Sequence, residues 1–90
     1  MDEKQLLNRI TVNQRIFAGK PIIRGHRLAV EHILSMMAAG DAPETILKGN
    51  SWLETADIQA CIMYASKLVS HEKIEVLIEV KALEFYWTHA

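Results

Sequence analysis

The sequence predicts a mainly α-helical domain in which three short helices follow a short β element. From Val30 onward, apolar residues recur with the spacing of one helix face. Glycine and proline separate these periodic stretches, and β-branched residues gather before the first of them. We expect all 90 residues to form a single domain, with residues 9–69 as β element and helical core and residues 70–90 as a C-terminal tail.

The β element is predicted from short extended runs between turn residues. Residues 9–12 (Arg-Ile-Thr-Val) are followed by Asn13, which is typical of a strand that ends in a turn. A second turn is indicated at residues 19–21 (Gly-Lys-Pro), and residues 22–23 form a short extended pair that Gly25 interrupts. These pieces predict a small hairpin or two short strands.

The first two helices are predicted from periodicity and end signals. Gly40 ends the first, because glycine tolerates the left-handed cap conformation. Pro43 suits the first position of the second helix, Glu44 complements the helix dipole, and residues 49–50 end it. The residues expected to be buried in these helices are Val30, Ile33, Leu34, Met37, Ala38, Ile46 and Leu47.

A third helix is predicted after Trp52 and Leu53, with Glu54 or Thr55 as its cap. Its apolar stripe is expected to comprise Ile58, Cys61, Ile62, Ala65, Leu68 and Val69. Its outer face is expected to carry Glu54, Thr55, Asp57, Gln59 and Met63. On this reading Cys61 is a buried core residue rather than a reactive thiol.

The tail fits two patterns. Residues 74–80 alternate mostly with a period of two, while Ile74, Leu77, Ile78, Ala82 and Phe85 also fit a helix. The β-branched content favours a strand from Ile74 to Val80. Because residues 74–87 hold more apolar surface than a small core can cover, we expect them to form a homodimer or higher oligomer.

Charge is distributed unevenly along the chain. Residues 4–30 contain six basic residues and no acid, whereas residues 31–90 contain nine acids and four lysines. Such a basic segment can bind phosphate or an acidic protein face, or it can simply be solvated. The candidate binding residues are Arg9, Arg15, Lys20, Arg24 and Arg27. For Arg27 we favour a structural role, in which it fixes the β element onto the first helix.

No catalytic or cofactor site is predicted. The four histidines lack metal-ligand spacing, and a single cysteine excludes a zinc cluster and an intramolecular disulfide. There is no nucleophile beside a base in a known motif, so we expect a protein that is not an enzyme and holds no cofactor or metal. The acidic start resembles no signal peptide, and no run of about 18 apolar residues could span a membrane. These features predict a cytoplasmic protein that has no membrane partner.

Residues 9–68 closely resemble the domain of unknown function 433 family of bacterial and archaeal proteins. The resemblance rests on residues that match the family pattern in order and spacing. These are Arg9-Ile10, Gly19-Lys20-Pro21, Gly25-His26-Arg27, Val30, Leu53, Asp57 and Ile58. The chain departs from the family pattern at Gln14, His26, Ala29 and Ala42. At Ala42 the usual capping serine or threonine is missing, and Asp41 is a candidate substitute cap.

The resemblance implies a three-helical, homeodomain-like helix-turn-helix core. Its members are described as antitoxin-like and typically encoded beside a PIN-domain ribonuclease toxin, which implies toxin binding and possible binding of operator DNA. The predicted third helix begins with acids, which phosphates repel, so any DNA contact is expected from the basic N-terminal segment. The alternative is a homo-oligomeric interaction module with no nucleic-acid function.

Overall fold

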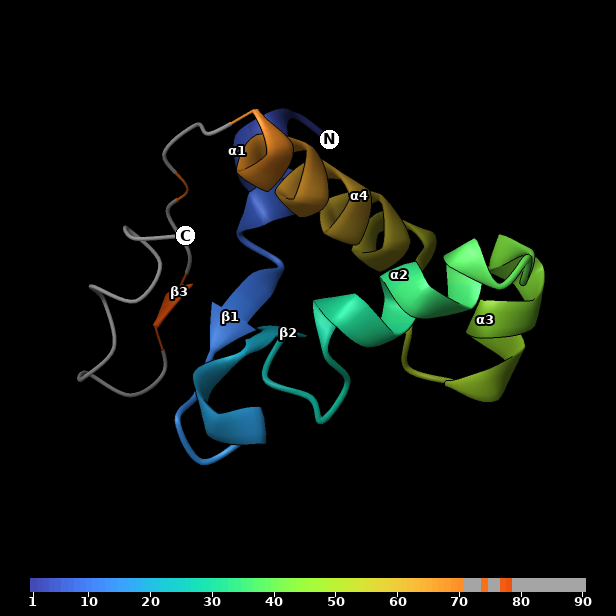
Figure 1. The fold of residues 1–90 in the computed structure, drawn as a ribbon, viewed down its shortest axis with the longest axis horizontal. Helices are drawn as coiled ribbons and strands as arrows, with labels where there is room; N and C mark the ends of the chain where they lie inside the picture. Colours follow the sequence, from blue (N-terminus) through green and yellow to red (C-terminus); the bar gives the residue numbers. More distant parts are fainter. Residues whose placement is uncertain (71–73, 75–76, 79–90) are drawn as a thin grey trace.

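The computed structural model describes residues 1–70, 74 and 77–78 of the chain. In this part of the chain the fold is mostly helical, with a small β element near the N-terminus (Figure 1). The elements follow in the order α1 (Glu3–Leu7), β1 (Ile10–Val12), a 3₁₀ turn (Phe17–Gly19), β2 (Pro21–Ile23), α2 (Val30–Ala38), α3 (Pro43–Gly49), α4 (Thr55–Val69) and β3 (Leu77–Ile78).

Helix α1 was not predicted from the sequence. Its N-cap residue is Asp2, whose carboxylate accepts the Gln5 N–H at 2.8 Å, while the Gln5 side chain accepts the Asp2 N–H at 3.0 Å. This reciprocal pair is a capping box, which stabilises even a short helix. The helix packs against α4, where Leu6 is buried and Glu3 pairs with Lys67 at 2.9 Å.

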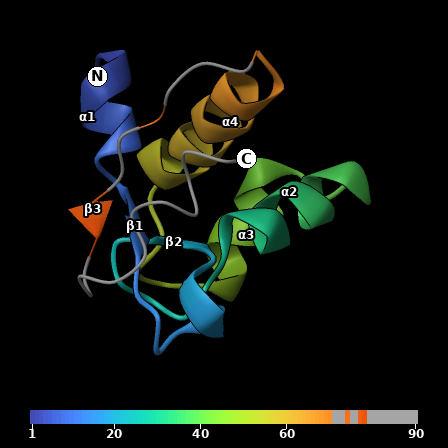
Figure 2. The same cartoon turned by 60° about the vertical axis from the view of Figure 1, so that its left-hand side comes forward.

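The predicted hairpin is confirmed. Strands β1 and β2 pair antiparallel, with Ile10 opposite Ile23 and Val12 opposite Pro21. The Gly25 N–H donates to the hydroxyl oxygen of the buried Thr11 at 2.9 Å, which joins the chain after β2 to β1. Figure 2 shows this β element on one side of the molecule, with α2 and α3 on the other.

A third strand lies on the free edge of β1. Strand β3 (Leu77–Ile78) runs parallel to β1, with Leu77 opposite Thr11, so the strand order is β2-β1-β3. The prediction of a strand over residues 74–80 is therefore confirmed at these two residues. The remainder of that prediction lies outside the described residues, as do most of residues 74–87, which were expected to form an oligomer.

The three predicted helices are present, and their bounds agree closely with the sequence signals. Pro43 occupies the first turn of α3, and Gly40 adopts a φ of +98° after α2. The N-cap of α3 is Ala42, which makes no side-chain capping bond, so the expected capping by Asp41 is wrong. In contrast to α3, the start of α2 has a side-chain contact: the Ala29 N–H donates to Nδ1 of His32 at 3.1 Å.

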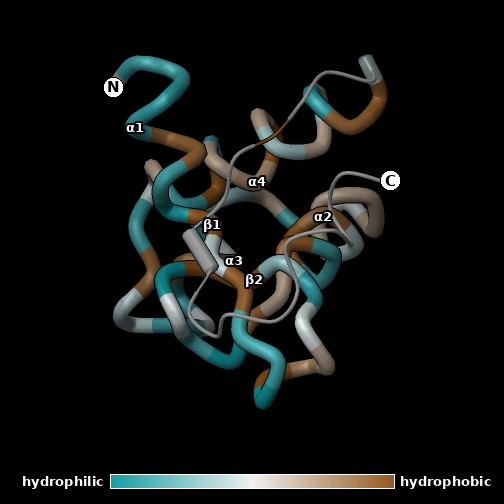
Figure 3. The backbone as a smooth tube through the Cα atoms, turned by 90° about the vertical axis from the view of Figure 1, so that its left-hand side faces the viewer, coloured by the Kyte–Doolittle hydropathy of each residue, from teal (hydrophilic) through white to brown (hydrophobic). Residues whose placement is uncertain are grey.

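The core lies between the sheet and the helices. Figure 3 shows apolar stretches of the chain in β1, β2 and α2. The buried members of the main cluster are Leu6, Ile10, Ile23, Val30, Ile33, Ile46, Leu53, Ile58, Ala60, Cys61 and Tyr64. Ile16, Ile22 and Ala29 form a second, smaller cluster. No helix in the described part of the chain is long and apolar enough to cross a membrane.

Four expectations for α4 are wrong. Ile62, Leu68 and Val69 were expected in the core but are 46%, 38% and 79% exposed. Asp57 was expected on the outer face but is fully buried. The buried stripe runs instead through Asp57, Ile58, Cys61 and Tyr64. Because Tyr64 fills the core where Ile62 and Ala65 were expected, the helix is rotated about its axis relative to the prediction.

Candidate functional site

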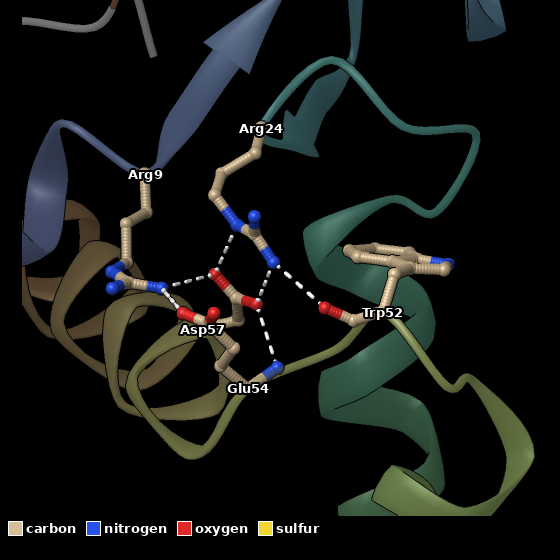
Figure 4. A network of polar contacts seen from close by, with 5 residues as sticks. All are labelled: Arg9, Arg24, Trp52, Glu54 and Asp57. Atoms are coloured by element: carbon tan, nitrogen blue, oxygen red, sulfur yellow. Dashed lines mark hydrogen bonds and ion pairs between the residues drawn. The ribbon is translucent and has the colours of Figure 1, made fainter.

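A buried carboxylate at the start of α4 organises the most densely bonded polar cluster among the described residues. Asp57 lies in the first turn of α4 and accepts the backbone N–H of Glu54 at 2.8 Å, as the acidic residue of a capping box does. Its side chain also accepts hydrogen bonds from two arginines, Arg9 and Arg24 (Figure 4). Both carboxylate oxygens are therefore occupied by donors.

The hairpin brings these two arginines together. Arg9 immediately precedes β1 and Arg24 immediately follows β2, so the pairing of Ile10 with Ile23 makes them neighbours. The Arg24 N–H donates to the Arg9 carbonyl oxygen at 2.8 Å. Arg24 adopts a φ of +45°, a left-handed conformation that is unfavourable for a residue with a side chain. The bonds from Arg24 to Asp57 hold the backbone in that conformation.

Opposite charges change the acid–base properties of the cluster. Burial by itself raises the pKa of Asp57, but the hydrogen bonds from Arg24, the Glu54 backbone and Arg9 outweigh it, so that this pKa lies below its ordinary value. The pKa of Arg9 is raised, chiefly by its hydrogen bond to the Glu54 carboxylate at 2.7 Å, and that of Arg24 by its hydrogen bonds to Asp57. The Asp57 carboxylate and the two guanidinium groups are thus ionised at neutral pH.

Arg24 also fixes the connection between α3 and α4. Its Nη2 donates to the Trp52 carbonyl oxygen at 2.9 Å, and its guanidinium carbon lies 5.6 Å from the centre of a Trp52 ring (Figure 4). The His26 ring stacks on Trp52 with centroids 3.8 Å apart and planes 4° from parallel. One arginine therefore joins the hairpin, the α3–α4 connection and the first turn of α4.

The hairpin, α2, α3, most of α4 and the Arg24–Asp57 pair lie within the region that a known family covers. The sequence model of a family described as a protein of unknown function, DUF433, matches residues 10–65. The chain belongs to the DUF433 family. Neither a curated protein nor a solved structure shows significant similarity to it.

In this DUF433 protein, three of the five candidate binding residues are engaged with carboxylates of the same chain. Arg9 and Arg24 bind Asp57, and Lys20 pairs with Glu31 at 2.7 Å on the surface. By contrast, Arg15 and Arg27 are exposed. Within the described residues, neither of these two side chains forms an ion pair or hydrogen bond.

Among the described residues, the Arg27 side chain makes no hydrogen bond or ion pair to the first predicted helix. Polar contacts join the β element to α4 instead, through Arg9 and Arg24. Asp57 was missed as a site residue because sequence reasoning places charged helix residues in solvent. A signal was available, since Glu54 and Asp57 have the spacing of a capping box, which points the second carboxylate back toward the preceding loop.

The cluster joins the hairpin to the start of α4 and to the α3–α4 connection. A carboxylate whose two oxygens accept four hydrogen bonds has no lone pair free for a substrate proton. Burial raises the pKa of the Cys61 thiol to about 12, which keeps it protonated and unreactive. Among the described residues, no three histidine, cysteine or acidic side chains gather as metal ligands.

Proposed function

We propose that this protein is an antitoxin-like regulator that binds and neutralises a PIN-domain ribonuclease. The observation that carries the proposal is the exposure of Arg15 and Arg27, which have no carboxylate partner in the described part of the chain. Both lie in loops next to the hairpin strands. Guanidinium groups bind carboxylates with two parallel hydrogen bonds, and PIN-domain ribonucleases are expected to have acidic catalytic sites.

We further propose that α3 and α4, joined by residues 50–54, form the helix pair of a homeodomain-like helix-turn-helix. The order of the helices and their position after the hairpin support this assignment. In such a pair the second helix reads the major groove with its first residues. Here that turn holds Glu54 and the buried Asp57, and the only basic residue of α4, Lys67, lies near its other end. A DNA-reading α4 is therefore not part of the proposal.

The test is co-expression of the tagged chain with the product of the adjacent gene. Co-purification and inhibition of RNA cleavage are the expected results. The Arg15→Ala/Arg27→Ala variant should bind about 10- to 100-fold more weakly, because two charge-assisted contacts are lost. The matched control is Lys4→Ala/Lys48→Ala, which removes two exposed positive charges elsewhere and should bind like the wild type.

Three outcomes would contradict the proposal. The first is the absence of any complex with the adjacent gene product. The second is unchanged affinity of the Arg15→Ala/Arg27→Ala variant, which would place the contact on another surface. The third is binding of promoter DNA, without partner binding, that weakens steeply between about 50 and 200 mM salt. That result would assign the two arginines to phosphate contacts instead.

A further inference from the structure

The solvent face of α4 carries no free charge. In the whole helix the charged residues are Asp57, which is buried, and Lys67, which pairs with Glu3 and is 15% exposed. A helix at the surface ordinarily presents charged residues to water. Five exposed and uncharged residues line this face instead, and together they are called the outer seam: Thr55, Gln59, Ile62, Ser66 and Val69.

The outer seam has the spacing of a helix–helix contact. Its members follow one another at alternating steps of four and three residues, which is the spacing of the contact positions in a coiled coil. The β-branched residues Thr55, Ile62 and Val69 occupy one of the two repeating positions, and Gln59 and Ser66 occupy the other. Ile62 and Val69 are 46% and 79% exposed, so the most apolar members face solvent.

We propose that the outer seam is the interface of a homodimer in which two α4 helices pack antiparallel about a two-fold axis at Ile62. In this register Ile62 meets Ile62 of the second copy at the centre. Gln59 of each copy faces Ser66 of the other, where an amide can hydrogen-bond a hydroxyl. Thr55 faces Val69 at both ends. The same surface is used twice, as a two-fold interface requires.

The absence of charge from the seam favours a second copy of the chain as the occupant. At a two-fold axis each residue approaches its own symmetry mate, so a charge near the axis would repel itself. A seam without free charge avoids this repulsion, whereas it offers an acidic or basic partner no ion pair. Three members of the seam also form part of a hollow of about 460 Å³, which is lined by Gln59, Ile62, Ser66, Met1, Leu6 and Met63. This hollow can receive apolar side chains of the second copy.

The size of the seam predicts a reversible dimer. A 15-residue helix is about 22 Å long. One pair of such helices buries less than the roughly 1,200–2,000 Å² of a stable interface. We therefore expect a dissociation constant in the micromolar range. The dimer does not involve Arg15 or Arg27, so it can be tested without a second protein and independently of toxin binding.

The first test is sedimentation equilibrium of the full chain over about 1 to 500 µM. The wild type should shift from monomer toward dimer as concentration rises. Ile62→Glu places two like charges at the axis and should weaken the dimer by about 100-fold or more. Because Ile62 is 46% exposed, the Ile62→Glu variant should keep its fold, as circular dichroism would show. The matched control is Thr45→Glu, at an exposed position of α3, and this variant should dimerise like the wild type.

The second test uses cross-linking. Ile62→Cys should form covalent dimers with a short bismaleimide, while Thr45→Cys and the wild type, whose only cysteine is buried, should not. A chain that stays monomeric throughout the concentration range would overturn the proposal. So would an Ile62→Glu variant with wild-type association. Loss of the dimer on deletion of residues 74–90, with no effect of Ile62→Glu, would place the interface in the tail and equally overturn it.

Discussion

Arg9 and Arg24 donate to the same carboxylate oxygen. Nη1 of Arg9 and Nε of Arg24 each lie 2.9 Å from Oδ1 of Asp57, and Nη2 of Arg24 lies 2.8 Å from Oδ2. The Glu54 carboxylate, 2.7 Å from Arg9 at the solvent side, supplies the second negative charge. Two positive and two negative charges thus balance around one buried group.

Removing the charge of Asp57 should strongly destabilise the protein. Asp57→Asn leaves two guanidinium groups facing an amide that cannot neutralise them, and loss of one partner from a buried ion pair costs about 3–5 kcal/mol. Urea denaturation followed by circular dichroism measures the change. Asp41→Asn, at an exposed acid, is the matched control and should change stability by less than about 0.5 kcal/mol. If Asp57→Asn changed the free energy of unfolding as little as Asp41→Asn does, the buried network would contribute nothing to stability.

Lysine should replace Arg9 better than Arg24. Arg24 uses two nitrogens on Asp57 and one of them also on the Trp52 carbonyl, a geometry that a single ammonium group cannot reproduce. Arg24→Lys should therefore lower the free energy of unfolding by about 1–3 kcal/mol. Arg9 contacts both acids through one nitrogen, so Arg9→Lys should cost less than about 1 kcal/mol. The reverse order in urea denaturation would contradict this assignment.

Stability should fall in acid because of Asp57. Its pKa is lowered in the folded protein because hydrogen bonds from Arg24, Glu54 and Arg9 outweigh burial, so the folded state binds this proton less tightly than the unfolded chain. The resulting stabilisation is fully present above the ordinary value of 3.8 and is lost as the pH falls through the lowered pKa. The ¹³C shift of the Asp57 carboxyl carbon, followed by NMR, should stay constant from pH 7 to about pH 4. A change of that shift between pH 7 and about pH 4 would refute the prediction.

Truncation of Ile62 should distinguish the observed rotation of α4 about its axis from the rotation that the sequence predicts, with the buried Ile33 of α2 as the reference. Ile33 is fully buried, so Ile33→Ala should cost about 2–5 kcal/mol. Ile62 is 46% exposed, so Ile62→Ala should cost less than about 1 kcal/mol in the monomer. Thermal unfolding at low micromolar concentration gives both values. A large loss for Ile62→Ala would mean that Ile62 lies in the core after all.

The elements of the fold could be predicted because local signals mark their ends. Gly40 and Pro43 bound the α2–α3 turn, and Asn13 and Gly25 bound the strands. Helix α1 was missed because its sequence is polar, although the pair Asp2 and Gln5 is a capping-box signal. Helical periodicity also leaves the rotation of a helix poorly determined when apolar residues occur on both sides, as Ile58, Ile62 and Tyr64 do in α4.

The candidate site was only partly predictable from the sequence. The uneven charge distribution correctly drew attention to Arg9 and Arg24, but it indicated a surface that meets an outside partner. Their actual partner, Asp57, lies 48 and 33 positions away along the chain. Contacts over such separations depend on how the hairpin and α4 pack, which no local pattern reports. The exposure of Arg15 and Arg27 likewise follows from the folded loops rather than from composition.

The long separation between Arg9 and Asp57 has a consequence for how the molecule opens. The bond between them closes a loop that contains the hairpin, α2 and α3. Exposing the backbone of β1 to solvent therefore requires the first turn of α4 to be released as well. Amide protons of β1 and of the first turns of α4 should consequently exchange with deuterium through the same cooperative opening, while those of α3, which forms no part of the network, exchange through smaller fluctuations.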